Sequence, residues 1–512
     1  MNRRAGFGLV NAAMLLVAVV AIALALVNLR ASGQGVGVAD IRIGHIPARV
    51  FTPAGGDQGP VVVIAHGFAG SQQLMQSFAL AFARNGYTAV TFDFAGHGRN
   101  PVPLGGSITE VDGATLTLMA EVAQVADHAR TLGDGRLAVL GHSMASDIVV
   151  RAAEADAGIA ATIAVSMFSP EVTAESPRNL LVIVGDWEGT LKREALRAVG
   201  LARADPEPGV TYGDPAAGTG RRVVFSPHVE HASVLFSQTS LREAVAWLDA
   251  VFGVQRAGGP VTEGRGPWIM LLIAGALLLA RPLERLLPVV VRPRAGAGLV
   301  WRRLALPVLL PMVATPLLLR VLPTHFLPVL VGDYLAAHFA VYGLLTAACL
   351  IWVRRGQVRP AVTQPLSLPA LALGALGVTA YFLAALVWPI NTYVTSFVPG
   401  EGRLVLLAVM LVGTALYFLA DEWLTRGVGE GRFAYPASKL AFLGSLGLAV
   451  ALDFERLFFL IIIVPVIVLF FIIHGLISRW AYRATGHPFV AGIANAVAFA
   501  WAIGVTFPLL AG

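Results

Sequence analysis

Repeated apolar blocks of membrane-spanning length fill the second half of the chain, and they constrain its fold more than any other feature. A helix needs about 20 mainly apolar residues to cross a hydrocarbon core. With 56% hydrophobic and only 13% charged residues among 512, the chain is too apolar for an ordinary soluble protein. Residues 267–512 are therefore predicted to form an all-α polytopic membrane domain. The expected spans lie at roughly 267–280, 304–320, 327–353, 367–390, 404–420, 440–452, 457–476 and 488–510.

The N-terminus carries a further apolar block. Two arginines precede an uninterrupted apolar run from about residue 7 to residue 27. This run is longer than the core of a signal peptide, about 7–15 residues, and it lacks a clear small-x-small cleavage site. Residues 1–34 are therefore predicted to form a retained signal-anchor helix and linker, which brings the total to about nine transmembrane helices.

The distribution of arginine predicts an orientation. Basic residues before the first helix place the N-terminus in the cytoplasm and the following region outside. With the later crossings, each strongly basic loop falls on the cytoplasmic side and the C-terminus lies outside. The span at 440–452 is short, and a re-entrant segment there would move the C-terminus to the other side. We expect a bacterial inner-membrane protein with residues 35–254 on the periplasmic or extracellular side.

Residues 35–254 have ordinary charge density and alternate strand-length apolar runs with helical patterns. Such alternation predicts an α/β domain with a doubly wound, mostly parallel sheet, because a buried parallel strand is apolar on both faces. Residues 255–266, "QRAGGPVTEGRG", form a linker to the membrane domain. Strands are expected at 48–54, 61–67, 88–94, 137–143, 161–168, 180–186 and 222–227, and helices at 71–85, 114–131, 144–155, 190–202 and 239–252.

The stretch "LAVLGHSMASDIVV", residues 137–150, places Ser143 between a strand-like and a helix-like run. A nucleophile elbow needs a strand, a sharp turn and a helix, with small residues two positions before and after the nucleophile. Gly141 and Ala145 occupy those positions. In a chain with 54 glycines such a match is a weak signal alone, so a polar residue in a tight turn is the alternative interpretation of Ser143.

Two upstream motifs strengthen the catalytic interpretation. The stretch "VVVIAHGFAGS" ends a strand with His66, Gly67 and Phe68, and "TFDFAGHGRN" follows the next strand. With these motifs in order, the region from about Asp40 to Gly253 resembles the α/β-hydrolase family, especially its esterase and dienelactone-hydrolase-like branches.

The resemblance implies a catalytic triad in the chain order nucleophile, acid, histidine. The stretch "LLVIVGDWEGT" supplies Glu188 at the family's usual position for the acid, with Asp186 as the alternate. The stretch "SPHVEHASVLF" supplies His228 and His231, of which the family's histidine loop favours His231.

In the mechanism that the resemblance implies, His231 takes the proton of Ser143, Glu188 stabilises the imidazolium, and the backbone N–H groups of Met144 and Phe68 bind the oxyanion. The expected function is a membrane-anchored serine hydrolase. It would cleave a carboxylic ester, thioester or lactone, including lipid-like substrates.

Other polar residues of these motifs, His66, Asp93, His97 and His142, are interpreted as structural. No cofactor or metal is expected, and the single cysteine, Cys349, lies within an apolar block. The net charge of +6 comes from arginines scattered in short loops, which argues against a nucleic-acid partner. The expected partners are a small-molecule or lipid ester and the membrane, and the oligomeric state stays open.

The membrane domain has candidates of its own. Asp333 and His338 lie in an apolar span, where ionisable groups are costly and therefore suggest function. Asp333 near the membrane interface is the alternative.

A second resemblance concerns "FLADEWLTRGVGE" and the C-terminal segment, which look like the CAAX-protease and bacteriocin-processing membrane family. That family's hallmark is E-E-x-x-x-R followed by two histidine motifs. Glu422 and Arg426 match the second glutamate and the arginine, while Asp421 replaces the first glutamate and Asn495 stands where the last histidine is expected. The resemblance implies a degenerate domain. The alternative function is thus a catalytically silent hydrolase-like binding domain on a transporter, receptor or degenerate intramembrane protease.

Overall fold

The computed structural model describes residues 2–56, 59–106, 111–355 and 363–511. Contacts between Cα atoms divide the chain into two compact units, and each is described by itself. Unit 1 comprises Met1–Ile22, Ile273–Pro389 and Val398–Phe507, and unit 2 comprises Ala23–Leu272, Ile390–Phe397 and Pro508–Gly512.

Unit 2 is built on one sheet of nine strands within the described residues, in the order β1-β2-β4-β3-β5-β6-β7-β9-β8. The run from β4 to β9 in this order is parallel throughout, whereas β1, β2 and β8 pair in antiparallel fashion. The predicted mostly parallel α/β sheet is confirmed. The strands are β1 (Val36–Ile43), β2 (Ile46–Pro53), β3 (Val61–Ala65), β4 (Thr88–Phe92), β5 (Leu137–His142), β6 (Ile159–Val165), β7 (Leu180–Gly185), β8 (Thr211–Tyr212) and β9 (Arg221–Ser226).

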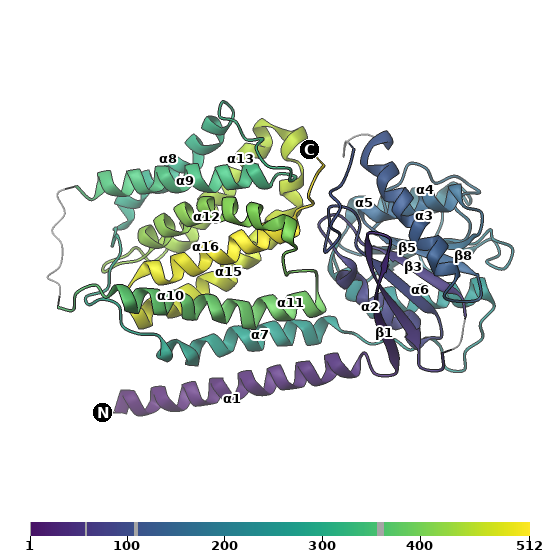
Figure 1. The fold of residues 1–512 in the computed structure, drawn as a ribbon, viewed down its shortest axis with the longest axis horizontal. Coiled ribbons are helices and arrows are strands. Elements are labelled where there is room, and N and C mark those ends of the chain that lie inside the picture. The colour runs from purple at the N-terminus through teal and green to yellow at the C-terminus, as the bar shows by residue number, and fades with distance from the viewer. Residues whose placement is uncertain (1, 57–58, 107–110, 356–362, 512) are drawn as a thin grey trace. The chain divides into compact units, whose positions relative to one another are not determined.

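Helices cover both faces of this sheet (Figure 1). One apolar core joins the sheet to α2 (Gln76–Arg84) and α6 (Gln238–Phe252), and a second joins it to α3 (Leu116–Arg130) and α4 (Met144–Ala155). A further helix, α5 (Gly189–Gly200), packs beside β7. This doubly wound arrangement explains why β3, β5 and β7 are buried along their whole length.

The hairpin of β1 and β2 is a feature that hydrophobic patterning did not predict. The strand β1 is mostly exposed and pairs with β2 along its whole length. Gly44, at φ +60°, lies in the tight turn between them, where a left-handed backbone favours glycine. The expected strand at 48–54 is therefore the second arm of a longer hairpin.

Unit 1 is helical, as predicted, and the number of candidate spans agrees with the expected number. Within the described residues, nine helical segments are long and apolar enough to cross a membrane. Of these, α12 packs against both α9 and α16 in unit 1 (Figure 1). The α-helices that follow α6 are α7 (Gly266–Leu283), α8 (Trp301–Leu319), α9 (Gly332–Val353), α10 (Leu368–Phe382), α11 (Trp388–Tyr393), α12 (Leu404–Thr425), α13 (Ala434–Leu452), α14 (Phe454–Leu457), α15 (Phe459–Thr485) and α16 (Pro488–Thr506), and the N-terminal helix is α1 (Asn2–Ala31).

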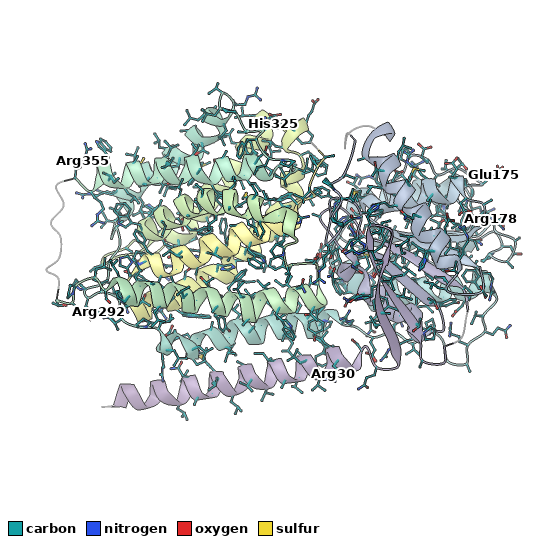
Figure 2. The ribbon with its side chains drawn as sticks, viewed as in Figure 1. Arg30, Glu175, Arg178, Arg292, His325 and Arg355 are labelled. Carbon is teal, nitrogen blue, oxygen red and sulfur yellow. The ribbon has the colours of Figure 1, made fainter. Side chains whose placement is uncertain are left out.

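The connections of unit 1 differ in charge from one end to the other. Figure 2 shows Arg292 and Arg355 at one end of the helices and His325 toward the other. At the end with Arg292, the loop before α8 contacts the loop after α9, because the N–H of Arg292 donates to the carbonyl of Gln364 at 3.2 Å. Arg294, two residues after Arg292, lines one cavity together with Arg426, Arg432 and Arg483, so these arginines gather at the same end, which is called the arginine-rich end of unit 1.

The predicted span at 440–452 proves too short, because α13 begins at Ala434. Lys439 interrupts the apolar pattern in the sequence, but its ammonium group is buried and forms an ion pair with Asp421 of α12. Ser438 adds a hydrogen bond from its hydroxyl to the same carboxylate at 2.5 Å. Neutralisation by a residue of another helix lets the charged position lie inside an otherwise apolar helix.

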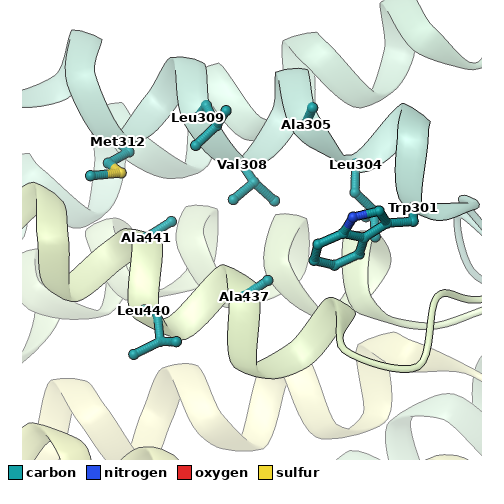
Figure 3. Close-up of a pocket in the computed structure, with 9 residues that line it drawn as sticks. All are labelled: Trp301, Leu304, Ala305, Val308, Leu309, Met312, Ala437, Leu440 and Ala441. Carbon is teal, nitrogen blue, oxygen red and sulfur yellow. The ribbon is translucent and has the colours of Figure 1, made fainter.

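An apolar cavity of about 520 Å³ lies between α8 and α13 (Figure 3). Its lining is aliphatic and aromatic, with Trp301 at one end and Met312 at the other. No ionisable side chain lines it among the described residues. This cavity therefore has no group suited to acid–base or nucleophilic chemistry.

Candidate active site

Ser143 occupies a sharp turn between β5 and α4. Its backbone has φ +54° and ψ −119°, a conformation that residues with a side chain rarely adopt. A Cβ atom on Gly141 would lie 2.3 Å from the carbonyl oxygen of Ala145, so the turn accepts only glycine there. Ala145 itself is fully buried, which explains the need for a small side chain. The local sequence thus produces the strand, turn and helix of a nucleophile elbow.

The structure brings Ser143, His231 and Glu188 into one hydrogen-bonded chain. Nε2 of His231 lies 2.9 Å from Oγ of Ser143, and Nδ1 of His231 lies 2.6 Å from Oε1 of Glu188. Ser143 follows β5, Glu188 follows β7 and His231 follows β9. Since these strands are parallel in one sheet, their carboxyl ends share an edge, and residues far apart in sequence meet there.

Glu188 is held as a carboxylate by its surroundings. Its Oε2 accepts hydrogen bonds from the hydroxyl of Ser166 and from the backbone N–H of Gly185, both at 2.7 Å. Burial alone would favour the protonated form, but the hydrogen bonds from His231, Ser166 and Gly185 outweigh it and lower the pKa of Glu188. Ser166 lies at the end of β6, and nothing in its local sequence marks it as a partner of the acid.

Asp186 and His228, the alternates, lie elsewhere. The carboxylate of Asp186 is exposed and lies 2.6 Å from Nζ of Lys192, whose hydrogen bond and charge lower the pKa of Asp186. His228 is exposed, with a left-handed backbone at φ +57°. The structure therefore brings Glu188, and not Asp186, to the ring of His231.

The loop that contains Phe68 lies directly against the elbow. A Cβ atom on Gly67 would lie 2.9 Å from the carbonyl oxygen of His142 and 3.0 Å from Cβ of Ser143. Glycine therefore permits this close approach. Met144 follows Ser143 at the start of α4, so both predicted oxyanion donors belong to segments that adjoin the nucleophile. Preorganised backbone N–H groups in such positions can stabilise a developing oxyanion.

Two buried histidines brace these segments. Nδ1 of His66 donates to the carbonyl of Gly67 at 2.8 Å, and its Nε2 accepts the N–H of Phe94 at 3.2 Å. Nε2 of His142 donates to the backbone carbonyl of His231 at 2.9 Å. Burial lowers the pKa of His66 to about 4; burial, aided by the nearby His231, lowers that of His142 to about 3. Both rings are thus neutral, in keeping with the structural roles expected for them.

Asp93 also has the expected structural role. Its buried carboxylate accepts the backbone N–H and side-chain amide of Gln72, at 2.8 and 3.1 Å, and the N–H of Arg99 at 3.0 Å. Glu121, which the sequence did not single out, accepts the N–H of Ala95 at 2.8 Å. These carboxylates hold the loops after β3 and β4 beside the elbow.

A further contribution comes from a distant stretch of the chain. Within unit 2, the hydroxyl oxygen of Ser71 accepts the N–H of Ser396 at 2.7 Å and lies 3.0 Å from Oγ1 of Thr395. Ser71 ends the same loop that begins at Gly67. No sequence motif indicates this support, because it comes from a short stretch between two apolar spans.

The membrane candidates Glu422 and Arg426 form a buried ion pair, with Nε to Oε2 at 3.0 Å. Asn495 approaches the other oxygen of Glu422 at 3.4 Å and donates to Oγ of Ser478 at 2.8 Å. Glu422 is therefore engaged through both of its oxygens.

Asp333 and His338 occupy the first two turns of α9. Asp333 accepts the backbone N–H groups of Tyr334 at 2.7 Å and Phe326 at 3.2 Å. It lies in the first turn of α9, where a negative charge interacts favourably with the helix dipole. The buried ring of His338 stacks on Tyr342 at 6.3 Å between ring centres. A functional role for either residue stays a prediction.

Residues 56–196 match the family described as serine aminopeptidase, S33 (Hydrolase_4). Among solved structures, the chain is similar to a Thermus thermophilus protein (16% identity, 43% of this chain and 99% of that chain, TM-score 0.33). It is also similar to a dienelactone hydrolase from Anabaena variabilis (15% identity, 42% and 96%, TM-score 0.30) and an epoxide hydrolase from Vigna radiata (13% identity, 42% and 98%, TM-score 0.30). No curated protein matches the chain. The family match supports a hydrolase enzyme with the α/β-hydrolase fold. It does not reach residues 267–512, so their resemblance to the CAAX-protease family stays a prediction.

Proposed function

We propose that this protein is a membrane-anchored serine hydrolase that uses Ser143, His231 and Glu188 to cleave a carboxylic ester, a thioester or a lactone. The observation that carries the proposal is the continuous hydrogen-bonded chain, 2.9 Å from Ser143 to His231 and 2.6 Å from His231 to Glu188. A serine hydroxyl is a weak nucleophile until a positioned base accepts its proton. Here the base is His231, which lies next to the hydroxyl of Ser143. The ionised carboxylate of Glu188 orients its ring.

The arrangement suits two-step acyl transfer. Oγ of Ser143 attacks the acyl carbonyl while Nε2 of His231 takes its proton, and the negative charge of Glu188 stabilises the imidazolium. The N–H groups of Met144 and Phe68 would bind the oxyanion. His231 then protonates the leaving alkoxide or thiolate, and an acyl-serine ester remains. Water attacks this ester with His231 again as the base, which releases the acid and restores Ser143.

Two exposed aromatic side chains support an acyl group with an apolar part. Phe168 and Trp187 are 65% and 66% exposed and follow β6 and β7 at the edge that contains Glu188. The N–H of Phe168 lies 3.4 Å from Oγ of Ser146, in the first turn after Ser143. Exposed apolar side chains in the loops that follow the same strand edge as the triad favour substrates that bury apolar surface on binding.

The order of the spans supports the expected orientation. Counting crossings from the N-terminus puts Ile390–Phe397 and Pro508–Gly512 on the same side of a membrane as the sheet, and unit 2 contains all of these stretches. A re-entrant α13 would break this agreement for the C-terminal stretch. With all nine helices crossing, the arginine-rich end faces the cytoplasm, and unit 2 faces the periplasm or the exterior.

The test is labelling of the full chain in detergent with a fluorophosphonate probe, which reacts with activated serines. Wild type should label, whereas Ser143→Ala and His231→Ala should not; Ser233→Ala, which removes a hydroxyl close to His231 in sequence, should label like wild type. A second measurement compares the rates at which the wild type hydrolyses short acyl esters and an aminoacyl anilide. We expect the esters to be cleaved faster. Labelling that persists in Ser143→Ala, or none in folded wild type, would refute the proposal.

A further inference from the structure

The arginine-rich end of unit 1 contains a cavity of about 590 Å³. It is formed by the end of α12, the start of α13 and the C-terminal part of α15, whose ribbons can be followed in Figure 1. Among the described lining residues, the one acid is Glu430. The cationic residues that line it are Arg294, Arg426, Arg432, Arg479 and Arg483. The cavity is therefore strongly positive.

Arg426 lines this cavity and has a buried donor without a protein acceptor among the described residues. The side chain is buried, at 5% exposure for the residue, and its Nε is paired with Glu422. The rings of Tyr435 and Tyr482 lie 5.5 and 5.7 Å from its Cζ and hold the guanidinium plane. Its Nη2 has no hydrogen-bond partner among the residues that the structure describes. Buried donors are normally paired, so this unpaired Nη2 is a feature that a bound acceptor would explain.

The other wall of the cavity is apolar. Ile472 and Leu476, one turn apart on α15, both line it and are both exposed. Gly475 and Pro436 complete this wall without adding charge. A ligand could therefore place an anionic group among the arginines and a hydrocarbon part along α15.

We infer that this cavity binds a phosphate group through Arg426 and the arginines around it. The planar guanidinium fork matches the oxygens of phosphate and binds them through paired hydrogen bonds. Basic cavities between transmembrane helices are a recurring site for anionic lipid head groups. The phosphate could belong to a phospholipid or be free in solution, and the apolar wall favours the phospholipid. This site is separate from Ser143 and does not depend on the proposed hydrolysis.

The binding test uses the purified full chain in detergent and lipids that differ only in the phosphate. Phosphatidic acid and diacylglycerol with the same acyl chains are compared by native mass spectrometry. Radiolabelled inorganic phosphate is measured in parallel by equilibrium dialysis. We expect phosphatidic acid to bind at least about tenfold more tightly than diacylglycerol, as a few charge-assisted contacts would produce.

The main variant is Arg432→Gln/Arg479→Gln, because both residues are exposed and line the cavity. Its matched control is Arg302→Gln/Arg303→Gln, which removes the same charge from the exposed start of α8, outside the cavity. The cavity variant should bind phosphatidic acid about tenfold more weakly, and the control should bind it like wild type. Arg426→Lys, which keeps the charge but loses the fork, should also weaken binding.

Each outcome decides the inference. Binding of phosphatidic acid that millimolar inorganic phosphate does not displace supports a phospholipid. Binding of inorganic phosphate with displacement of the lipid supports a soluble phosphate in the same site. If neither ligand binds wild type better than diacylglycerol, or if both double variants lose affinity equally, the cavity is not a phosphate site.

Discussion

Nδ1 of His231 lies 2.6 Å from Oε1 of Glu188, while Asp186, two positions earlier, is paired with Lys192. The turn after β7 thus directs one acid toward the histidine and the other toward solvent. This difference separates two carboxylates that the sequence alone leaves as alternatives.

Replacing Glu188 by glutamine should reduce kcat/KM for a short acyl ester by about 100- to 10,000-fold, because the imidazolium loses its stabilising charge. Asp186→Asn removes an equal charge nearby and should stay within about twofold of wild type. Initial-rate kinetics with both variants check this. A larger loss in Asp186→Asn than in Glu188→Gln would assign the acid to Asp186 instead.

Gly67→Ala should impair catalysis without unfolding the protein. The added Cβ would meet the backbone of His142 and Cβ of Ser143, so the loop that contains Phe68 must move away. Loss of an oxyanion donor typically lowers kcat by about 100- to 1,000-fold. Gly189→Ala, where a Cβ would meet nothing within 4 Å, is the matched control and should keep wild-type rates. Unchanged kinetics in Gly67→Ala would argue against this loop as part of the catalytic site.

Acid should destabilise unit 2 partly through His142. Burial and the neighbouring His231 lower its pKa from 6.5 to about 3. Below about pH 6.5 the imidazole of His142 binds a proton in the unfolded chain, whereas in the folded chain it binds one only near pH 3. The stabilisation from the neutral ring is therefore complete above about pH 6.5 and is lost as the pH falls toward 3.

His142→Gln should accordingly lose less stability than wild type between about pH 7 and about pH 4.5. The measurement is the temperature at which brief heating abolishes half of the fluorophosphonate labelling. His228→Gln, at an exposed position, is the control. Equal slopes with pH in wild type and His142→Gln would show that this ring does not contribute.

The Asp421 and Lys439 pair should stabilise unit 1 only as a pair. Lys439→Met leaves a buried carboxylate without its cation, which typically costs about 3–5 kcal/mol. Asp421→Asn/Lys439→Met removes both charges and should recover much of that loss. Melting temperatures of the full chain in detergent measure both variants. A double variant no more stable than Lys439→Met would contradict the coupling.

Phe168 and Trp187 should influence the preference for acyl-chain length. Phe168→Ala and Trp187→Ala should raise KM for longer acyl esters and leave KM for acetyl esters nearly unchanged, because only the longer chains reach apolar surface. Leu201→Ala, an exposed apolar residue after α5, should change neither. If chain-length preference is identical in all variants, the acyl group binds elsewhere.

The sequence predicted the central sheet because buried parallel strands such as β5 are apolar on both faces, a pattern that one short stretch reveals. It missed β1, whose residues are mostly exposed and therefore lack that pattern. It also shortened α13, since the charge on Lys439 is neutralised by Asp421 from another helix. Local patterns identify elements, but contacts between distant residues determine where some of them begin.

In the candidate site, too, local patterns could be predicted from the sequence and contacts between distant residues could not. The turn around Ser143 could be recognised because its small neighbours are local requirements of the elbow. The choice between Glu188 and Asp186 depended on a family resemblance, and the supporting Ser166 had no signal at all. Ser166 reaches the acid only because β6 and β7 lie side by side in the sheet.

Unit 2 is assembled from separate stretches of the chain, so a single proteolytic cut cannot shed it whole. Cleavage in the linker 255–266 would release the sheet but leave Ser396 behind with the helices. The hydroxyl of Ser71 would then lose the N–H that it accepts at 2.7 Å, at the end of the loop that lies against Ser143. A form released by such cleavage would carry the loop beside Ser143 without this hydrogen bond, and we expect it to be less active than the uncut chain.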